Sequence, residues 1–132
     1  QYLADTTKEQ NLLAPIGELK RYHTLEWLNY VATELHKSIG MFFNTKLTDE
    51  VKDTIYMPMI THKLKFVDEH LSKNTYLMGG NFSLADAYLF VILRWAHYFK
   101  MDLSSYPHIE QFMKHVGERP SIVEALKQEE LP

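Results

Sequence analysis

The sequence predicts an all-α fold, a bundle of about five to six helices around one buried central helix. Glycine and proline are sparse, five of each in 132 residues, and they fall between long segments with helical periodicity. A sandwich or barrel of strands would need many more turns. One later segment is apolar on nearly every side, which is typical of the helix in the middle of a bundle.

Composition and charge exclude several other classes of protein. The chain is 45% hydrophobic with a formal net charge of -3, too apolar and too weakly charged for a disordered chain. Fourteen basic residues against 17 acidic ones do not indicate a nucleic-acid partner. The longest apolar run, 87–93, is far shorter than the roughly 20 residues of a membrane span, so we expect no membrane partner.

The residue types present also exclude some kinds of active site. Cysteine is absent, so the chain holds no disulfide, zinc–thiolate site or cysteine nucleophile, which is compatible with a reducing compartment. The seven histidines show neither the His-x-x-x-His nor the Glu-x-x-His spacing, so we expect no metal site. The sequence contains no phosphate-binding loop and no Gly-x-Ser-x-Gly turn.

The N-terminal residues predict how the chain is organised. It begins at Gln1 rather than at a methionine, and residues 2–4 are typical of the end of a helix. The segment 5–14 is polar and then apolar, as in a linker. We therefore expect part of a longer protein, in which residues 1–10 end one domain and residues 11–132 form the next.

The first long helix is predicted from about Pro15 to Ile39. Proline is tolerated at a helix start, and Gly40 suits its end. Apolar residues spaced three and four apart predict one buried face, which Trp27 and Val31 widen. The residues of this face are Leu25, Leu28, Ala32, Leu35 and Ile39.

The second helix is predicted to begin after a cap at Thr48 or Asp49. Pro58 lies inside the helical pattern, so we expect a kink or break near Met57. The residues of its core face are Ile60, Leu64, Val67 and Leu71. The segment 74–82, which contains two adjacent glycines, is predicted as a loop.

Three further helices complete the expected bundle. The segment 84–100 is the predicted central helix, apolar nearly all round. Pro107 begins a fourth helix, which Gly117 ends, and Pro120 begins a short fifth. The expected inward residues are Ile109, Phe112, Met113 and Val116 in the fourth and Ile122, Val123 and Leu126 in the fifth.

The start of the central helix carries the sharpest local signal. Ser83 is placed as its N-cap, with its hydroxyl accepting from the Asp86 backbone N–H, while the Asp86 carboxylate accepts from the Ser83 N–H. Phe82 and Ala87 stand at the positions of a hydrophobic staple. We interpret this capping box as structural, because it satisfies two donors at a buried helix start.

Several segments carry a family resemblance. Residues 76–86 read Tyr-Leu-Met-Gly-Gly-Asn-Phe-Ser-Leu-Ala-Asp, which resembles a signature of the C-terminal domain of cytosolic glutathione transferases. Residues 27–30, Trp-Leu-Asn-Tyr, and 34–37, Glu-Leu-His-Lys, are similar to the first helix of this domain in the bacterial beta class. Residues 93–96 resemble its central helix and 118–121 the start of its last helix, so the resemblance spans the whole chain.

The resemblance implies a protein of two parts. In this family a thioredoxin-like N-terminal domain holds the catalytic Cys, Ser or Tyr, and the all-α C-terminal domain walls the pocket for a hydrophobic electrophile. Residues 1–10 then correspond to the end of the thioredoxin-like domain and the linker. The implied function is conjugation of glutathione, a co-substrate rather than a cofactor, by a cytoplasmic homodimer. The chain alone is expected to be inactive.

One face of the first helix is polar. At about 100° per residue, Asn29, Thr33, His36 and Lys37 share one arc, away from the apolar stripe. From the pattern alone, this arc is either a solvated helix face or a surface for a carboxylate-rich peptide. The resemblance implies glutathione-binding residues at Asn29, Glu34, His36 and Lys37, with His36 and Lys37 beside the thiol. Thr33 also matches this set in its position on the helix, so the resemblance includes it among the glutathione-binding residues.

The central helix carries a second candidate set. Arg94 is a charge in an apolar surround, and such a charge is rarely buried without a partner. It either pairs with a carboxylate, such as Asp86 or one at an interface, or lines a pocket. Trp95 is either core or pocket wall. The resemblance implies that Arg94, Trp95 and His97 line the electrophile pocket.

An alternative function remains open at this point. Domains of this kind also occur as non-catalytic scaffolds in translation factors, synthetases and starvation-response proteins, so the fold alone does not decide the function. The set Asn29, Glu34, His36 and Lys37 favours the enzyme over a protein-interaction module, because a scaffold has no need of it.

Overall fold

The computed structural model describes residues 1–7 and 12–129. Every regular segment within them is helical, apart from one isolated β-bridge between Tyr76 and Gly79, so the all-α prediction is confirmed. The elements are α1 (Tyr2–Thr6), α2 (Leu19–Tyr30), the π-helical η1 (Val31–His36), α3 (Lys37–Gly40), the 3₁₀-helical η2 (Met41–Phe43), α4 (Asp49–Val51), the π-helical η3 (Lys52–Tyr56), α5 (Met57–Leu71), α6 (Leu84–Tyr98), α7 (Pro107–Gly117) and α8 (Pro120–Gln128).

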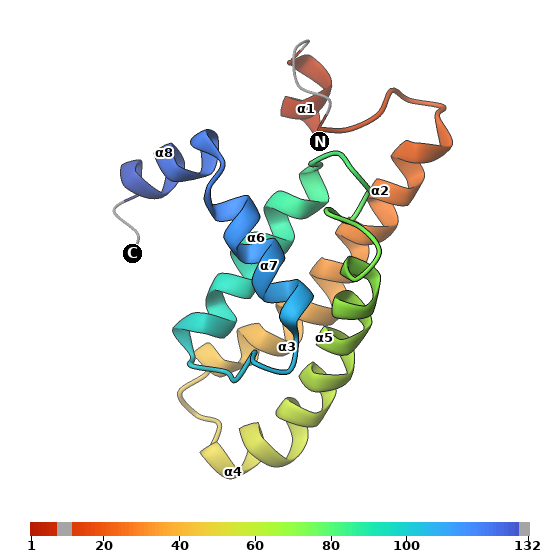
Figure 1. Cartoon of the computed structure of the whole chain (residues 1–132). Helices are drawn as coiled ribbons and strands as arrows, with labels where there is room; N and C mark the ends of the chain where they lie inside the picture. Colours follow the sequence, from red (N-terminus) through yellow and green to blue (C-terminus); the bar gives the residue numbers. More distant parts are fainter. Residues whose placement is uncertain (8–11, 130–132) are drawn as a thin grey trace.

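Helix α6 lies at the centre of the bundle, as predicted. It contacts α2, η1, α3 and α7. In Figure 1 the rod formed by α2, η1 and α3 runs beside α5 in the opposite direction, and α7 crosses in front of α6. The buried residues of α6 are Ala85, Asp86, Leu89, Phe90, Ile92, Leu93 and Ala96.

The central helix is not covered on every side, however. Val91, which the apolar pattern places in the core, is 48% exposed, and Tyr98 is 72% exposed. The helix also ends at Tyr98 rather than at Lys100, which has a φ of 56°, a left-handed conformation that an α-helix does not continue. The open side of α6 faces a groove described below.

The first long helix begins later than predicted. Its expected start was Pro15, whereas α2 begins at Leu19. Residues 15–18 form a turn instead, in which the Glu18 N–H donates to the Pro15 carbonyl over 3.2 Å. Gly17 has a φ of 94°, which places its backbone in the left-handed region that excludes it from a helix.

The buried face of this helix also differs from the predicted one. Val31, Leu35 and Ile39 are completely buried, and the first turns bury Arg21 and Thr24. The expected core residues that are only partly buried are Leu25, Leu28 and Ala32. The physical reason is η1, because a π turn has more residues than an α turn and breaks the 3.6-residue phase on which the prediction depends.

The second helix agrees with the prediction in each of its parts. The Thr48 hydroxyl accepts from the Val51 N–H over 3.3 Å and caps α4. The π turn η3 interrupts the helix immediately before Met57, where Pro58 made a break expected. The predicted core face is buried throughout: Ile60, Leu64, Val67 and Leu71.

The last two helices agree in position but differ in burial. Helix α7 has the predicted bounds, and its four expected inward residues, Ile109, Phe112, Met113 and Val116, are all buried. Helix α8 begins at Pro120 as predicted, but none of its residues is fully buried. Ile122 and Leu126 pack against the core, while Val123 is half-exposed. The reason is that the main contact of α8 with the bundle is with α7.

The N-terminal segment is fastened to the bundle by one buried cation. Arg21 donates to both carboxylate oxygens of Asp5, at 2.7 and 2.9 Å, and to the Ala14 carbonyl. This ion pair lowers the pKa of Asp5. Asp5 belongs to α1, whereas the predicted linker began there. The boundary expected between residues 10 and 11 lies outside the described residues.

The capping box at the start of α6 is present as predicted. The fully buried Asp86 carboxylate accepts from the Ser83 N–H at 2.8 Å, the Ser83 hydroxyl at 2.6 Å and the Leu77 N–H at 2.7 Å. Burial raises the pKa of Asp86, although these hydrogen bonds oppose the shift. The carboxylate therefore does two things: it caps α6, and it holds the two ends of the loop 77–83 together.

Candidate functional site

The structure separates the five predicted glutathione-binding residues into three groups. Asn29, Thr33 and Lys37 are exposed, and the Thr33 hydroxyl donates to the Asn29 carbonyl over 2.9 Å. Glu34 is turned to α5, and His36 to α6. The arc expected from helical geometry therefore holds only in part, since the π turn lies within it.

The carboxylate of Glu34 is engaged by a lysine of α5. Its Oε2 lies 3.0 Å from Nζ of Lys63, and this interaction is the main cause that lowers the pKa of Glu34. The Thr33 hydroxyl also lies within hydrogen-bond distance of this carboxylate, at 3.3 Å. Glu34 therefore remains ionised at neutral pH and joins the polar face of the helix to α5.

His36 is half-buried between η1 and α6. Its Nδ1 lies 2.5 Å from the Tyr88 hydroxyl, and the edge of Trp95 meets its ring with centroids 4.8 Å apart. When a hydroxyl donates to Nδ1, the neutral imidazole carries its proton on Nε2. In that tautomer the Nε2–H is free of the Tyr88 contact and can donate to a group beside the ring.

The second predicted set comes together in one groove. Arg94, Trp95 and His97 all line a cavity of about 980 Å³ along the open side of α6. Its other walls come mainly from apolar residues of η2, α6, α7 and α8: Phe43, Ala87, Phe90, Val91, Tyr98, Met113, Ile122, Ala125 and Leu126. A mostly apolar groove of this size suits a small hydrophobic ligand.

Trp95 connects the two sets. One neighbour of its ring is His36, and another is Phe43, which meets it edge-on with centroids 5.1 Å apart. Phe43 also stacks on Tyr98, which lines the same groove. His97 lies on the exposed rim, with Nε2 3.3 Å from a Glu110 carboxylate oxygen. The polar helix and the apolar groove thus share one aromatic wall.

Two contributors to this wall were missed at the level of sequence. Tyr88 stands seven residues before Trp95, so both lie on one face of α6, and this spacing is the signal that could have identified it. Phe43 gave no such signal, because it lies in a 3₁₀ turn that the pattern treated as loop. One expectation paired Arg94 with Asp86. The Asp86 carboxylate accepts hydrogen bonds from Ser83 and from the Leu77 N–H.

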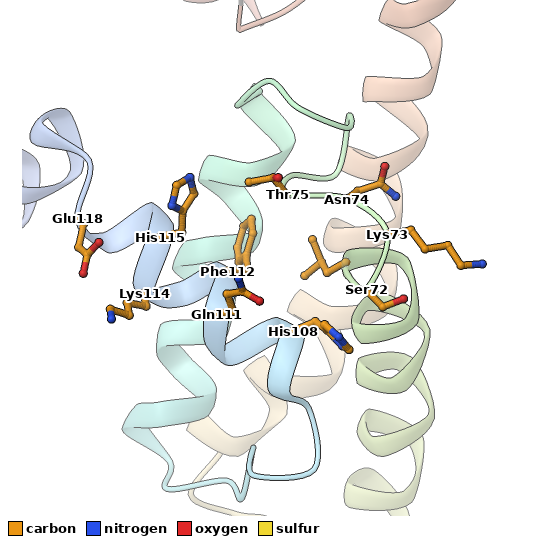
Figure 2. Close-up of a pocket in the computed structure, with 11 residues that line it drawn as sticks. Ser72, Lys73, Asn74, Thr75, His108, Gln111, Phe112, Lys114, His115 and Glu118 are labelled. Carbon is orange, nitrogen blue, oxygen red and sulfur yellow. The ribbon is translucent and has the colours of Figure 1, made fainter.

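A second cavity of about 560 Å³ lies between the end of α5 and α7, and none of the predicted site residues line it. Figure 2 shows its lining, which comes from residues 72–75 after α5 and from side chains of α7, while the Lys73 side chain extends away from α7. Its His108 is held by Asp68, which accepts from the imidazole Nδ1 and from two N–H groups at the start of α7, each at 2.9 Å. This arrangement is explained by helix capping.

Within residues 1–7 and 12–129, no three potential metal-ligating side chains gather in one place. Over the same part of the chain, no helix has the length and apolar character to cross a membrane.

Comparisons with known proteins agree with this geometry. Residues 30–120 match the family described as the glutathione S-transferase C-terminal domain. The chain is 44% identical over 131 residues to glutathione S-transferase GstA of Escherichia coli O157:H7, covering 99% of this chain and 65% of that protein. The chain therefore belongs to the glutathione S-transferase C-terminal domain family, as the resemblance implied.

Solved structures show the same relationship. The ternary complex of BphK, a bacterial glutathione S-transferase, superposes with a TM-score of 0.93 and 38% identity over 98% of this chain and 64% of that one. A sphingomonad glutathione S-transferase complexed with glutathione gives a TM-score of 0.91 and 31% identity, over 99% of this chain and 65% of that one. The chain thus spans less than two thirds of the length of these relatives.

Proposed function

We propose that the chain is the C-terminal domain of a glutathione transferase that conjugates the glutathione thiolate to hydrophobic electrophiles. The observation that carries this proposal is the position of His36, whose ring touches the Trp95 wall of the apolar groove. A hydrogen-bond donor at the edge of an apolar groove suits this reaction, because it can stabilise a negatively charged sulfur beside a hydrophobic substrate.

The residues divide into two functions. Asn29 and Lys37 present hydrogen-bond donors on an exposed face that suits a peptide with two carboxylates, and glutathione is such a peptide. Thr33 lies on the same face, with its hydroxyl donating to the Asn29 carbonyl. Lys37 and His36 favour the thiolate over the thiol, since positive charge and N–H donors lower a thiol pKa. Glutathione is the co-substrate, and the reaction requires no cofactor.

The electrophile is proposed to occupy the groove along α6. Trp95 forms its wall nearest His36, while Arg94 and His97 provide polar groups on an otherwise apolar lining. The shape of the groove limits substrates to small hydrophobic molecules.

The missing parts of the enzyme are proposed from the relatives. The chain covers 65% of the E. coli protein and 64% of BphK, which leaves room for a thioredoxin-like N-terminal domain carrying the nucleophile. We place the whole protein in the cytoplasm as a homodimer. Exposed aromatic residues on α2 and α5, Tyr22 at 51% and Phe66 at 50%, support a partner on that side.

The test is an assay of the full-length protein with glutathione and an aryl halide. We expect conjugation well above the uncatalysed rate, and a loss of about tenfold in kcat/KM for His36→Ala. If the full-length protein neither conjugates nor binds glutathione, the non-catalytic scaffold is the better description.

A further inference from the structure

The π turn η1 decides which way His36 and Lys37 point. A π turn contains about one residue more than an α turn, so every side chain after it is rotated by about 100° relative to an uninterrupted helix. His36 is the last residue of η1, and Lys37 is the first of α3. If the turn relaxed to α geometry, His36 would lose its place between Tyr88 and Trp95.

One residue of α5 holds this turn from the side. Nζ of Lys63 lies 2.7 Å from the Ser38 hydroxyl, 3.1 Å from the Glu34 backbone carbonyl and 3.0 Å from the Glu34 carboxylate. An ammonium group has three protons, and these three acceptors match them. The Lys63 side chain is only 15% exposed, so the contacts exchange little with water.

The backbone of Lys63 is fastened to the same turn. The Tyr30 hydroxyl donates to the Lys63 carbonyl over 3.1 Å, and Tyr30 directly precedes η1. The Tyr30 side chain is partly buried, and this burial raises the pKa of Tyr30 to about 12, so the hydroxyl stays protonated and remains a donor. Both ends of the π turn are thus bonded to one residue of the neighbouring helix.

The carbonyl at the centre of these contacts is that of Glu34. It accepts from the Lys63 ammonium and from the Ser38 hydroxyl, the latter in a short hydrogen bond. Side-chain donors that reach a helix carbonyl stabilise local departures from α geometry, because they replace the N–H bonds that the departure weakens. Lys63 and Ser38 therefore favour the π turn over a regular helix.

From these contacts we propose that Lys63 is a positioning residue for the thiol site: it holds the π turn of η1 and thereby keeps His36 against Tyr88 and Trp95. The proposal rests on the proposed function of His36. It assigns a task to a lysine that touches neither the groove nor His36 in the described structure.

The experiment compares three variants of the full-length protein. Lys63→Met keeps the length and the apolar stem of the side chain but removes its three donors. Lys63→Arg keeps the charge and several donors, and it should behave much more like the wild type than Lys63→Met does. Lys65→Met is the matched control, since Lys65 lies on the same helix, is 70% exposed and makes only a 3.8 Å pair with Glu69 among the contacts of the described residues.

We expect Lys63→Met to shift the pH profile of kcat/KM to higher pH by about half a unit or more, with a three- to tenfold loss below the inflection and recovery above it. Lys65→Met should leave the profile unchanged. Long-range ¹⁵N–¹H spectra of the histidine rings, assigned with His36→Gln, should show that His36 loses its single tautomer in Lys63→Met only. A loss of stability without movement of the turn would shift neither readout.

The proposal is overturned if Lys63→Met folds and keeps both the wild-type pH profile and the His36 ring signals. Should Lys63→Met fail to fold, Ser38→Ala removes one contact of the same cluster and must shift both readouts in the same direction, or the proposal is wrong. A wild-type protein without conjugating activity would overturn the proposed function instead, and the His36 ring signals would still decide whether Lys63 holds the turn.

Discussion

At the scale of single residues, His36 is the point where the polar helix and the apolar groove meet. Its Nδ1 is engaged by Tyr88, and its ring rests on the edge of Trp95. Both partners come from α6, 52 residues away from His36 in the first of these contacts. The side chain is therefore oriented by its contacts with α6 as well as by its own turn.

The first prediction concerns the thiol. In the full-length protein, His36→Ala and Lys37→Ala should each move the titration of bound glutathione to higher pH by about one unit, because each removes a donor or a charge from the proposed thiol site. Tyr88→Phe should cause a smaller shift in the same direction. Asn29→Ala should mainly weaken glutathione binding, since an amide carries no charge. Thiolate absorbance measured against pH separates these effects.

His23→Ala serves as the control for this series, because His23 is an exposed residue of α2 that pairs with Glu26. It should leave the titration unchanged. A shift in Asn29→Ala with none in His36→Ala or Lys37→Ala would reverse the assignment of these functions.

The second prediction concerns the buried capping box. Asp86→Ala should destabilise the fold by about 3 kcal/mol, because three donors that Asp86 satisfies become buried and unpaired. Ser83→Ala should cost about 1 kcal/mol, since it removes the cap hydroxyl alone. Chemical denaturation of both variants measures the difference. Equal midpoints for the two variants would mean that water reaches the Leu77 and Ser83 donors.

The third prediction concerns the pH dependence of stability. Lys63 lowers the pKa of Glu34 below its ordinary value, so the folded state favours the ionised carboxylate. The resulting stabilisation is fully present above the ordinary pKa of a glutamate and is lost as pH falls through the lowered pKa of Glu34. Urea midpoints of the wild type and Glu34→Gln should therefore differ at pH 7 and converge toward pH 3.

Glu69→Gln is the control, because Glu69 pairs with Lys65 at 3.8 Å on the exposed side of α5 and both side chains are mostly in water. Its midpoints should follow those of the wild type at every pH. If Glu34→Gln behaves like Glu69→Gln, the Glu34–Lys63 pair contributes no net stability.

At the scale of elements, the sequence was most informative where helices are regular. The buried faces of α5 and α7 follow the 3.6-residue period and were predicted completely. The face of α2 was predicted in part, because η1 changes the phase of the pattern and no residue type marks a π turn. The start of α2 was misplaced because Pro15 is favourable at a helix start but also in a turn.

The candidate site was predictable to a similar extent. The polar residues of the first helix and the groove residues Arg94, Trp95 and His97 were found by pattern and resemblance. Tyr88 was missed, although its spacing of seven residues from Trp95 places both on one face of α6. Lys63 could not be found in this way, because it acts through contacts with a helix distant in sequence, about which periodicity within one helix carries no information.

The fourth prediction concerns the turn before α2. Gly17→Ala should destabilise the fold by about 1 kcal/mol, because alanine is strained at a φ of 94°. A Cβ at this position would meet nothing within 4 Å, so crowding does not contribute. Gly80→Ala is the control, as a Cβ there also meets open space and its φ is not positive. Thermal unfolding of both variants should show a loss for Gly17→Ala only.

At the scale of the whole molecule, the groove along α6 remains open on one side. Val91 and Tyr98 are exposed there, and α8 contributes partly buried residues without closing it. A surface of this kind is typical of one half of a site that a second domain completes.

The fifth prediction follows from this open surface. The 132-residue chain expressed alone should fold, because η1, α3, α5, α6 and α7 together form a buried hydrophobic core, but should not conjugate glutathione to an aryl halide. Circular dichroism and a conjugation assay test the two halves of the statement. Turnover above the solution rate by this chain alone would contradict the need for a second domain.

The π turn η1 has a consequence for the length of the helix that contains it. A helix with one such turn holds one residue more than a regular helix of the same span, as if a single insertion had been absorbed without lengthening the rod. Deleting Ala32 would remove that residue and leave a regular helix with the same ends. If this chain were aligned with a sequence that has one residue fewer in this helix, the gap could be placed anywhere in 31–36. Its position in the structure would be the π turn that Lys63 holds.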